Sequence, residues 1–305
     1  MNFGLRFEKK KFHYTTPVTV GTNKVANNTA LRITYPDGHH LDLAPLPFFH
    51  QYDISQWQFA IETTLEKLVF VPEKIDFKKP LFGLGTFNQK DLELLYAIEA
   101  VLFSFLENSH PHLLPQAGPV KINGLYSEKI PFKSTPECVK IKIRPGEEGS
   151  CLNAIQECQK LRSDVIFRLD GNRTFELESL LHFMGTLAQG LESVSVQYLE
   201  EPFKNFADLY GFRKISSVPI ALDESLLYHL EDLSQFKEEF FILKPTLLGL
   251  STCFALIEHF PGRTIISSTY EWPEAMKALY VLAALNPEQF HGLDTEKFLP
   301  KEFSN

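Results

Sequence analysis

The sequence is poor in the residues that mark disulfide-rich, membrane and disordered proteins. It has 4 cysteines among 305 residues, without CxxC spacing, which argues against a disulfide framework or a zinc site. No uncharged run approaches the roughly 18 residues of a membrane span, the first residues carry no apolar signal-peptide core, and no low-complexity tract occurs. We therefore expect a folded, cytoplasmic protein with no membrane partner, in which Cys138, Cys151, Cys158 and Cys253 are reduced thiols.

Positive charge is also in deficit, since Lys and Arg number 30 against 38 for Asp and Glu and the formal net charge is −8. Nucleic-acid binding is driven largely by Lys and Arg that neutralise phosphates, so the composition gives no reason to expect a nucleic-acid partner. The length and the 44% of apolar residues are sufficient for a sizeable core in one large or two ordinary domains. The oligomeric state stays open.

The pattern of the chain changes near residue 118. Up to residue 87, short strand-like runs alternate with turns, among which residues 35–38, Tyr-Pro-Asp-Gly, are a clear turn signal, and this favours a small α+β unit. Residues 89–108 carry apolar side chains three and four positions apart, which predicts a helix that joins two parts. We place the domain boundary inside this helix, with domains at 1–98 and 99–305, and with the C-terminal tail free to pack back on the first domain.

Beyond residue 118, short β-rich runs are separated by stretches long enough for helices, such as 177–191. Seven such runs, with an eighth candidate at 290–293, favour a closed parallel barrel over an open sheet. The seven runs are 120–125, 139–143, 165–170, 195–200, 219–223, 240–244 and 264–268.

In the second of these runs, Lys140 and Lys142 alternate with Val139, Ile141 and Ile143. Successive side chains of a strand point to opposite faces, so both lysines share one face and point into the barrel if the apolar face meets the helices. An edge strand with a solvated lysine face is the alternative for an isolated Lys-x-Lys pattern. The ends of the later runs favour the first interpretation.

Four later runs each end in or just before an ionisable residue: Asp170, Glu200, Asp223 and Lys244. Active-site residues of βα barrels lie at these C-terminal strand ends. Any one acid could instead cap the following helix, but three on consecutive strands, flanked by lysines, favour a shared site. Converging carboxylates raise one another's pKa unless a cation neutralises them, and an all-oxygen ligand set favours Mg²⁺, with Mn²⁺ as the alternative.

Two lysines beside such a metal indicate proton-transfer chemistry. A free lysine has a pKa of about 10.4, so a lysine base needs desolvation or a neighbouring cation, which a second lysine and Mg²⁺ supply. A substrate carboxylate on the metal has its α-proton acidified because the enediolate is stabilised, and the lysines can exchange protons with it. We expect Lys142 and Lys244 to face a small-molecule carboxylate substrate from opposite sides.

These residues resemble the enolase superfamily, for which a lysine base with Mg²⁺ is an established pairing, and within it the o-succinylbenzoate synthase family. The resemblance runs along nearly the whole chain. Its motifs are Ala44-Pro45-Leu46-Pro47, Ala97-Ile98-Glu99, Lys140-Ile141-Lys142, Leu169-Asp170-Gly171-Asn172-Arg173, Leu199-Glu200-Glu201-Pro202, Leu222-Asp223-Glu224-Ser225, Leu243-Lys244-Pro245-Thr246, Ile266-Ser267-Ser268 and His291-Gly292-Leu293-Asp294-Thr295.

The resemblance implies a modified TIM-type (β/α)7β barrel with an N-terminal α+β capping domain. It also implies Mg²⁺-dependent syn dehydration of 2-succinyl-6-hydroxy-2,4-cyclohexadiene-1-carboxylate to 2-succinylbenzoate in menaquinone biosynthesis. The implied metal ligands are Asp170, Glu200 and Asp223.

Roles for the lysines follow from the same resemblance. Lys142 would take the α-proton and then act as the acid, Lys244 would stay protonated and stabilise the enediolate, and Lys140 would support the site from the same strand face. The further residues expected near the metal or substrate are Asn172, Arg168, Glu201, Glu224, Ser267 and Ser268.

Two segments depart from the family pattern. Residues 270–274 read Tyr-Glu-Trp-Pro-Glu where relatives have a Glu-Ser-Ser-Leu-Gly-like stretch, and residues 38–43 read Gly-His-His-Leu-Asp-Leu where relatives tend to have Gly-Glu. The first departure would reshape the wall around the succinyl chain. Rival interpretations are an N-acylamino acid racemase or dipeptide epimerase with the same residues, a metal-free Schiff-base aldolase with Lys244 as nucleophile, and a degenerate barrel kept as a scaffold.

Overall fold

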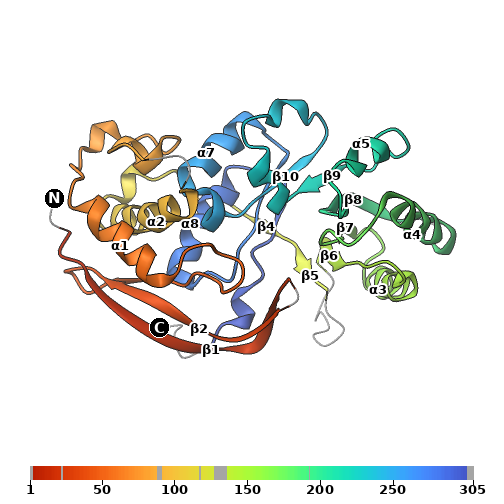
Figure 1. Ribbon diagram of the computed structural model, residues 1–305, viewed down its shortest axis with the longest axis horizontal. Coiled ribbons are helices and arrows are strands. Elements are labelled where there is room, and N and C mark those ends of the chain that lie inside the picture. Colours follow the sequence, from red (N-terminus) through yellow and green to blue (C-terminus); the bar gives the residue numbers. More distant parts are fainter. Residues whose placement is uncertain are drawn as a thin grey trace. The chain divides into compact units, whose positions relative to one another are not determined.

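The computed structural model describes residues 3–21, 23–87, 91–116, 118–126, 136–191 and 193–300 (Figure 1). The chain forms two compact units, which we call unit 1 (residues 1–121 and 243–305) and unit 2 (residues 122–242). The predicted domain boundary at residue 98 stays a prediction; residues 89 and 90 of the predicted helix and the tail at 301–305 lie outside the described residues. Among the described helices, none has the length and apolar character needed to cross a membrane.

Unit 1 contains an antiparallel sheet whose strands follow the order β1-β2-β3. The strands are β1 (Arg6–Val20), β2 (Asn23–Thr34) and β3 (His40–Leu43). The predicted turn at residues 35–38 connects β2 to β3: the Gly38 N–H donates to the Tyr35 carbonyl at 3.0 Å, and Gly38 has a φ of 93°. A side chain is disfavoured at that φ, which explains the glycine.

The helices of unit 1 are arranged around α2, which is buried on nearly all sides from Leu95 to Leu106. An apolar run without a polar face is typical of a core helix. Among the described helices of unit 1, α2 packs against each of the other α-helices. The helix predicted at 89–108 is therefore a central element of unit 1. The helices are α1 (Ile54–Leu65), α2 (Leu92–Ser109), α6 (Pro245–Leu248), α7 (Leu250–His259) and α8 (Pro273–Ala284), with the short 3-10 helices η1 (Pro72–Lys74), η2 (Pro80–Gly83), η3 (Pro111–Leu113) and η6 (Glu296–Phe298).

A second apolar cluster of unit 1 joins the antiparallel sheet to the end of the chain. Phe12 of β1 contacts the ring of Trp272 at 4.9 Å between centroids, and the buried Leu299 belongs to the same cluster. The Thr15 hydroxyl donates to the Lys297 carbonyl at 3.0 Å. Burial of each such large side chain contributes about 1.5–3 kcal/mol, so residues near the C-terminus stabilise the N-terminal sheet.

Unit 2 consists of parallel strands that alternate with helices. Seven consecutive strands pair in the order β11-β10-β9-β8-β7-β6-β5, and neighbouring strands are parallel throughout unit 2. The elements are β5 (Gly124–Leu125), β6 (Cys138–Lys142), α3 (Glu148–Leu161), β7 (Ile166–Asp170), α4 (Leu177–Gly190), β8 (Ser195–Glu200), α5 (Asp208–Phe212), β9 (Ile220–Leu222), η4 (Glu224–Tyr228), η5 (Leu233–Gln235) and β10 (Phe240–Leu243), and β11 (Thr264–Ile266) in unit 1 follows β10.

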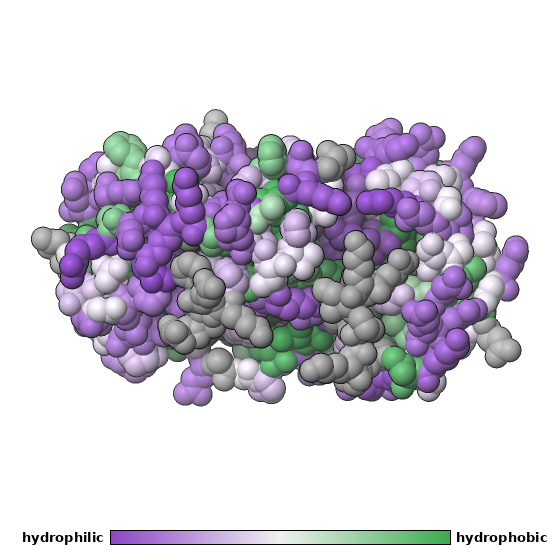
Figure 2. Space-filling model, turned by 90° about the horizontal axis from the view of Figure 1, so that it is seen from below, coloured by the Kyte–Doolittle hydropathy of each residue, from purple (hydrophilic) through white to green (hydrophobic). Residues whose placement is uncertain are grey.

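The result is a curled half-barrel with helices, which confirms the predicted fold class. The eighth candidate strand is β12 (Phe290–His291), which pairs with β4 (Lys121–Ile122) in a separate two-stranded ladder. Hydrophilic residues cover most of the described surface on the face drawn in Figure 2, and apolar residues appear there in small groups.

The buried carboxylate of Glu99 on α2 makes the stability of unit 1 depend on pH. It accepts the backbone N–H of Leu81 at 2.9 Å and that of Ser251 at 3.0 Å. Burial nevertheless raises its pKa from the usual 4.5 to about 7. Between about pH 4.5 and pH 7, Glu99 therefore keeps its proton in the folded state but loses it in the unfolded state. The free energy of unfolding consequently falls as the pH rises through this range.

We expect Glu99→Gln to reduce that slope, by at most about 1.4 kcal/mol per pH unit. Chemical denaturation at several pH values measures how the free energy of unfolding changes with pH. This pH dependence is compared, and not the stability at one pH, because the loss of one hydrogen-bond acceptor also changes the absolute stability. Glu62→Gln on the exposed side of α1 is the control. An unchanged slope in Glu99→Gln would mean that Glu99 ionises in the folded protein as it does when unfolded.

Candidate active site

The two lysines of β6 lie on one face of an interior strand. Val139, Ile141 and Ile143 are buried, whereas Lys140 is partly exposed and Lys142 is exposed. Strand β6 pairs with β5 on one side and β7 on the other, so the edge-strand alternative does not apply within the sheet. The alternation therefore separates a packed apolar face from a face that carries both lysines.

Register brings the ends of these strands to one edge of the sheet. Lys142 pairs with Asp170, and Asp170 pairs with Glu200. Glu200 in turn pairs with Ala221, two positions before Asp223. The three acids are almost fully buried, with exposed fractions of 5%, 2% and 8%. Parallel strands place their carboxyl ends together, which is where barrel enzymes carry catalytic groups.

One ammonium group links two of these acids. The Lys140 Nζ lies 2.6 Å from Glu200 Oε1 and 2.9 Å from Asp170 Oδ2. Burial alone would lower the pKa of Lys140, but the charges of Asp170, Glu200 and Asp223 outweigh it and raise that pKa well above the usual value. Lys140 therefore stays charged and is unsuited to act as a base.

The pKa of Asp170 changes in the opposite direction. Burial would raise it, yet the positive charges of Lys140 and Lys142 hold it below its usual value. Asp170 Oδ1 also accepts the backbone N–H of Asn172 at 3.1 Å and its side-chain amide at 2.7 Å. Asp170 is therefore ionised at neutral pH, as a metal ligand must be.

The donor set of these acids fits a hard divalent cation. Three buried carboxylates lie at neighbouring strand ends, where one partly exposed ammonium pairs with two of them, and like charges in a buried site need further neutralisation. All available donors are oxygens, which is the chemistry that Mg²⁺ prefers. In the structure Lys140 contacts two of the three acids. The ligand atoms of the three acids do not all lie within 4.8 Å of one another. Among the described residues, His40, Asp42 and Glu274 do meet that distance.

Glu201, the residue after the predicted ligand, binds backbone rather than facing the other acids. Its Oε1 accepts the N–H groups of Asp223 and Ser225, each at 2.8 Å, and the Ser225 hydroxyl. Burial raises the pKa of Glu201 above its usual value. Glu201 thus holds the backbone on which Asp223 is mounted. Glu224 begins η4 and is partly buried.

Lys244 lies in unit 1, where it follows β10 and precedes α6. Its Nζ lies 5.0 Å from the ring centroid of Phe49, a favourable cation–π distance. Two residues later in the chain, Thr246 shares a hydrogen bond of 2.9 Å with Thr269, and the Thr269 hydroxyl donates to Glu271 Oε1 at 2.8 Å. Burial raises the pKa of Glu271 to about 7, although the charge of Lys244 lowers it.

The relatives of this chain decide its family. It is 28% identical over 317 residues to an o-succinylbenzoate synthase of Aliivibrio fischeri strain MJ11, covering 94% of this chain and 89% of the relative. It is 30% identical over 268 residues to an o-succinylbenzoate synthase of Yersinia pseudotuberculosis serotype I, covering 83% and 77%. The chain belongs to the o-succinylbenzoate synthase family of the enolase superfamily. No protein-family model matches it.

Solved structures agree on the fold of this enolase-superfamily member. An o-succinylbenzoate synthase from Thermosynechococcus elongatus, crystallised with magnesium in its active site, has a TM-score of 0.67 at 16% identity and covers 97% of this chain and 94% of its own. The L-Ala-D/L-Glu epimerase of Bacillus subtilis has a TM-score of 0.70 at 17% identity, with coverage of 97% and 90%. At such identities the likeness supports the fold alone.

Gly171 of the family motif Asp170-Gly171-Asn172 lets β7 approach β8. A Cβ built on Gly171 would lie 2.7 Å from Pro202 Cα and 3.4 Å from the Glu201 carbonyl oxygen. The Gly171 N–H also donates to the Glu200 carbonyl at 2.9 Å. A side chain here would push apart the two strand ends that carry Asp170 and Glu200, because backbone atoms cannot yield as a flexible side chain can.

We expect Gly171→Ala to lower the free energy of unfolding by about 1–3 kcal/mol, measured by chemical denaturation. Gly185→Ala on α4 is the matched control, since a Cβ there meets nothing within 4 Å. That control should be neutral or stabilise the protein by up to about 1 kcal/mol. Equal stability of the two variants would contradict the close approach of β7 and β8.

Arg168 of this enolase-superfamily chain lies within the sheet, fully buried. Its Nε donates to Gln197 Oε1 and its Nη1 to Asn123 Oδ1, each at 2.8 Å. Its guanidinium also stacks on the Tyr198 ring at 4.8 Å. Arg168 lies two positions before Asp170, on the same face of β7. Its contacts with Gln197, Asn123 and Tyr198 therefore hold the strand in place next to Asp170. A role beside the substrate stays a prediction.

The two predicted serines of the family motif follow β11 in unit 1 and contact different segments. Ser267 donates its backbone N–H to the Leu243 carbonyl at 2.9 Å, so it continues the pairing of β11 with β10. Ser268 is buried, and its hydroxyl lies 2.5 Å from the Thr295 hydroxyl. A role in binding a succinyl carboxylate stays a prediction for both residues.

Sequence reasoning missed several residues that contact predicted site residues or their neighbours within each unit. They are Asn123 and Ser225 in unit 2, and Phe49, Thr246, Thr269 and Glu271 in unit 1. Ser225 was present in the Asp223-Glu224-Ser225 motif, where its place two residues after a predicted ligand was the available signal. Thr246 was likewise present in the Leu243-Lys244-Pro245-Thr246 motif, and Glu271 in the departing segment 270–274. Asn123, Phe49 and Thr269 had no such signal, because their contacts join segments far apart in the chain.

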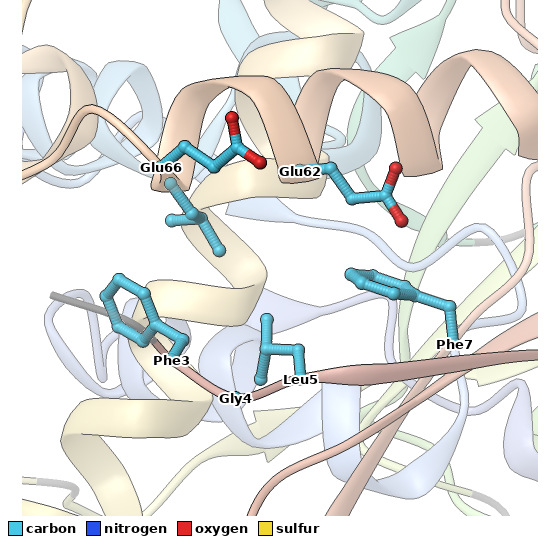
Figure 3. A pocket seen from close by; sticks show the side chains of 7 residues that line it. Phe3, Gly4, Leu5, Phe7, Glu62 and Glu66 are labelled. Carbon is cyan, nitrogen blue, oxygen red and sulfur yellow. The ribbon is translucent and has the colours of Figure 1, made fainter.

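Unit 1 also has a cavity of about 520 Å³ that contains none of the predicted site residues. Phe3, Leu5 and Phe7 line it from the N-terminal segment, opposite Glu62 and Glu66 at the end of α1 (Figure 3). With acids on one side and no converging set of polar groups, it has no chemistry that matches the family.

Proposed function

We propose that this protein is an o-succinylbenzoate synthase, which dehydrates 2-succinyl-6-hydroxy-2,4-cyclohexadiene-1-carboxylate to 2-succinylbenzoate, with Mg²⁺ held by Asp170, Glu200 and Asp223. The observation that carries the proposal is the joint binding of Asp170 and Glu200 by Lys140 at adjacent strand ends, in a chain of this family. When bound, Mg²⁺ would supply Lewis-acid stabilisation of negative charge on the substrate carboxylate.

The proton transfers are assigned to Lys142. As the neutral amine it takes the proton from the carbon next to the carboxylate, and the electron pair of that C–H bond moves onto the carboxylate. The carbon–oxygen bond then breaks on the same face while this electron pair returns to form the new double bond of the ring. The Lys142 ammonium gives its proton to the departing hydroxide, which leaves as water. Lys140 cannot replace it, because the adjacent carboxylates hold its proton.

Lys244 is assigned to charge stabilisation. Remaining protonated, it would balance the negative charge that develops on the substrate. The contact of its ammonium with the Phe49 ring supports a charged form, since the face of an aromatic ring attracts cations.

An ultraviolet assay for 2-succinylbenzoate formation tests the proposal. We expect turnover of the cyclohexadiene substrate with Mg²⁺, loss with EDTA and recovery when Mg²⁺ is restored. A racemase or epimerase with the same residues would leave this substrate unchanged and exchange the α-proton of N-acylamino acids or dipeptides with solvent deuterium. Covalent trapping of substrate by borohydride would instead indicate a Schiff base on a lysine and would overturn the metal-dependent mechanism.

A further inference from the structure

The two segments that depart from the family pattern meet in unit 1. His40 and Asp42 come from the first segment and lie on β3, and Glu274 comes from the second and lies in the first turn of α8. One ligand atom from each of the three lies within 4.8 Å of the other two. We propose that His40, Asp42 and Glu274 bind one divalent transition-metal cation of the Zn²⁺ class.

The distances suit ligands that share an ion. His40 Nε2 lies 3.8 Å from Asp42 Oδ2 and 3.8 Å from Glu274 Oε1, which is too long for hydrogen bonds. Ligand atoms held tetrahedrally at about 2.0–2.2 Å from a metal lie roughly 3.3 Å apart, so small side-chain shifts would complete the site. His40 Nε2 and Glu274 Oε2 are buried atoms without a hydrogen-bond partner among the described residues. Buried polar atoms in native proteins are normally partnered, and a cation would supply the missing partner.

Arg32 orients one of the ligands. Asp42 is only 2% exposed, and its carboxylate accepts Arg32 Nε at 2.8 Å and Nη2 at 2.5 Å. This pair balances the charge of Asp42 and fixes the plane of its carboxylate, in the way that outer contacts orient metal ligands. The charge of Glu274 is then left opposite an imidazole.

The electrostatics and donor types favour a cation of the Zn²⁺ class. Burial raises the pKa of Glu274, and the charge of Asp42 raises it further, against the opposite effects of His40 and Arg32. One imidazole nitrogen with two carboxylates suits Zn²⁺, Co²⁺ or Ni²⁺, whereas Mg²⁺ prefers oxygen ligands only. The side chains of His40 and Glu274 are 25% and 21% exposed, so the cluster lies near the surface of unit 1 although its unpartnered atoms are covered. The bound ion would tie β3 to the start of α8.

Isothermal titration calorimetry with ZnCl₂ tests the site on the full chain, with Mg²⁺ in large excess to occupy the barrel carboxylates. We expect one saturable Zn²⁺ site, weakened at least about tenfold in His40→Gln and in Glu274→Gln. His39→Gln is the matched control, because His39 stacks on Tyr35 and pairs with Asp37 instead. Zn²⁺ should also raise the melting temperature of the wild type and of His39→Gln, but not of Glu274→Gln.

Asp223→Asn is titrated in parallel and should bind Zn²⁺ like the wild type. The four cysteines are buried and do not compete. The proposal is overturned if no saturable Zn²⁺ binding occurs. That result is expected if His40, Asp42 and Glu274 form only ion pairs with one another. The proposal is also overturned if His40→Gln and Glu274→Gln bind as the wild type does, or if Asp223→Asn alone loses the site. Because the readout is Zn²⁺ binding, its outcome is independent of whether the dehydration assay succeeds.

Discussion

Replacing Lys142 with alanine should abolish dehydration while Mg²⁺ binding remains. Lys142 is the exposed lysine at the end of β6, and its charge acts on Asp170 without lying between the carboxylates. Removing a general base lowers turnover by roughly 10²–10⁴-fold, and the second use of the same group as the acid adds to the loss. Turnover by the ultraviolet assay and Mg²⁺ binding by calorimetry measure the two effects separately.

Lys160→Ala, an exposed lysine on α3 of the same unit, is the matched control and should keep full activity. Circular dichroism should show the same fold for both variants, since an exposed lysine at a strand end contributes little to stability. If purified Lys142→Ala retained full dehydration activity, the proposed proton transfer would be wrong. If it lost Mg²⁺ binding along with turnover, Lys142 would serve the carboxylate cluster rather than the chemistry.

Asp223→Asn should weaken both Mg²⁺ binding and turnover. The amide keeps the size of the carboxylate but removes its charge, and we expect the affinity for Mg²⁺ to fall at least about tenfold. The backbone N–H of Asp223, which donates to Glu201, is unaffected by the exchange. The fold at the end of β9 should therefore persist, and the loss should appear as a higher Mg²⁺ requirement in calorimetry and in the assay.

The control for charge removal is Asp164→Asn, whose side chain is 71% exposed and pairs with Arg162 at the surface. It should leave Mg²⁺ affinity and turnover unchanged. Wild-type affinity in Asp223→Asn would show that β9 contributes no metal ligand. A collapse of stability in Asp223→Asn, seen by chemical denaturation, would assign the carboxylate a structural role instead.

Much of the half-barrel follows from local patterns. The run predicted at 195–200 is β8 without change, and those at 165–170 and 240–244 differ from β7 and β10 by one residue. Apolar, β-branched runs and helical periodicity are properties of neighbouring residues, so they survive folding. The helix predicted to join two domains was also located, but its burial inside unit 1 depended on contacts with helices from distant segments.

In the candidate site, too, some features follow from local sequence patterns and others only from packing between distant segments. Asp170, Glu200 and Asp223 were predicted because each ends a strand, and their burial at one edge of the sheet agrees with that pattern. The use of Glu201 to hold the Asp223 backbone and the burial of Arg168 against Asn123 were not predictable. Neither pairing has a signature in the neighbouring residues, because each depends on how separate strands and loops pack.

By itself, the sequence determined which chemical groups stand at the strand ends, since strand alternation and the position of an acid after an apolar run are local. Only the tertiary structure decided that Lys140 is shared by two carboxylates and therefore keeps its proton. It also decided that His40 and Asp42 meet Glu274 from the far end of the chain. The physical reason is that charge interactions and ligand geometry depend on distances of a few ångströms, which packing sets between residues remote in sequence.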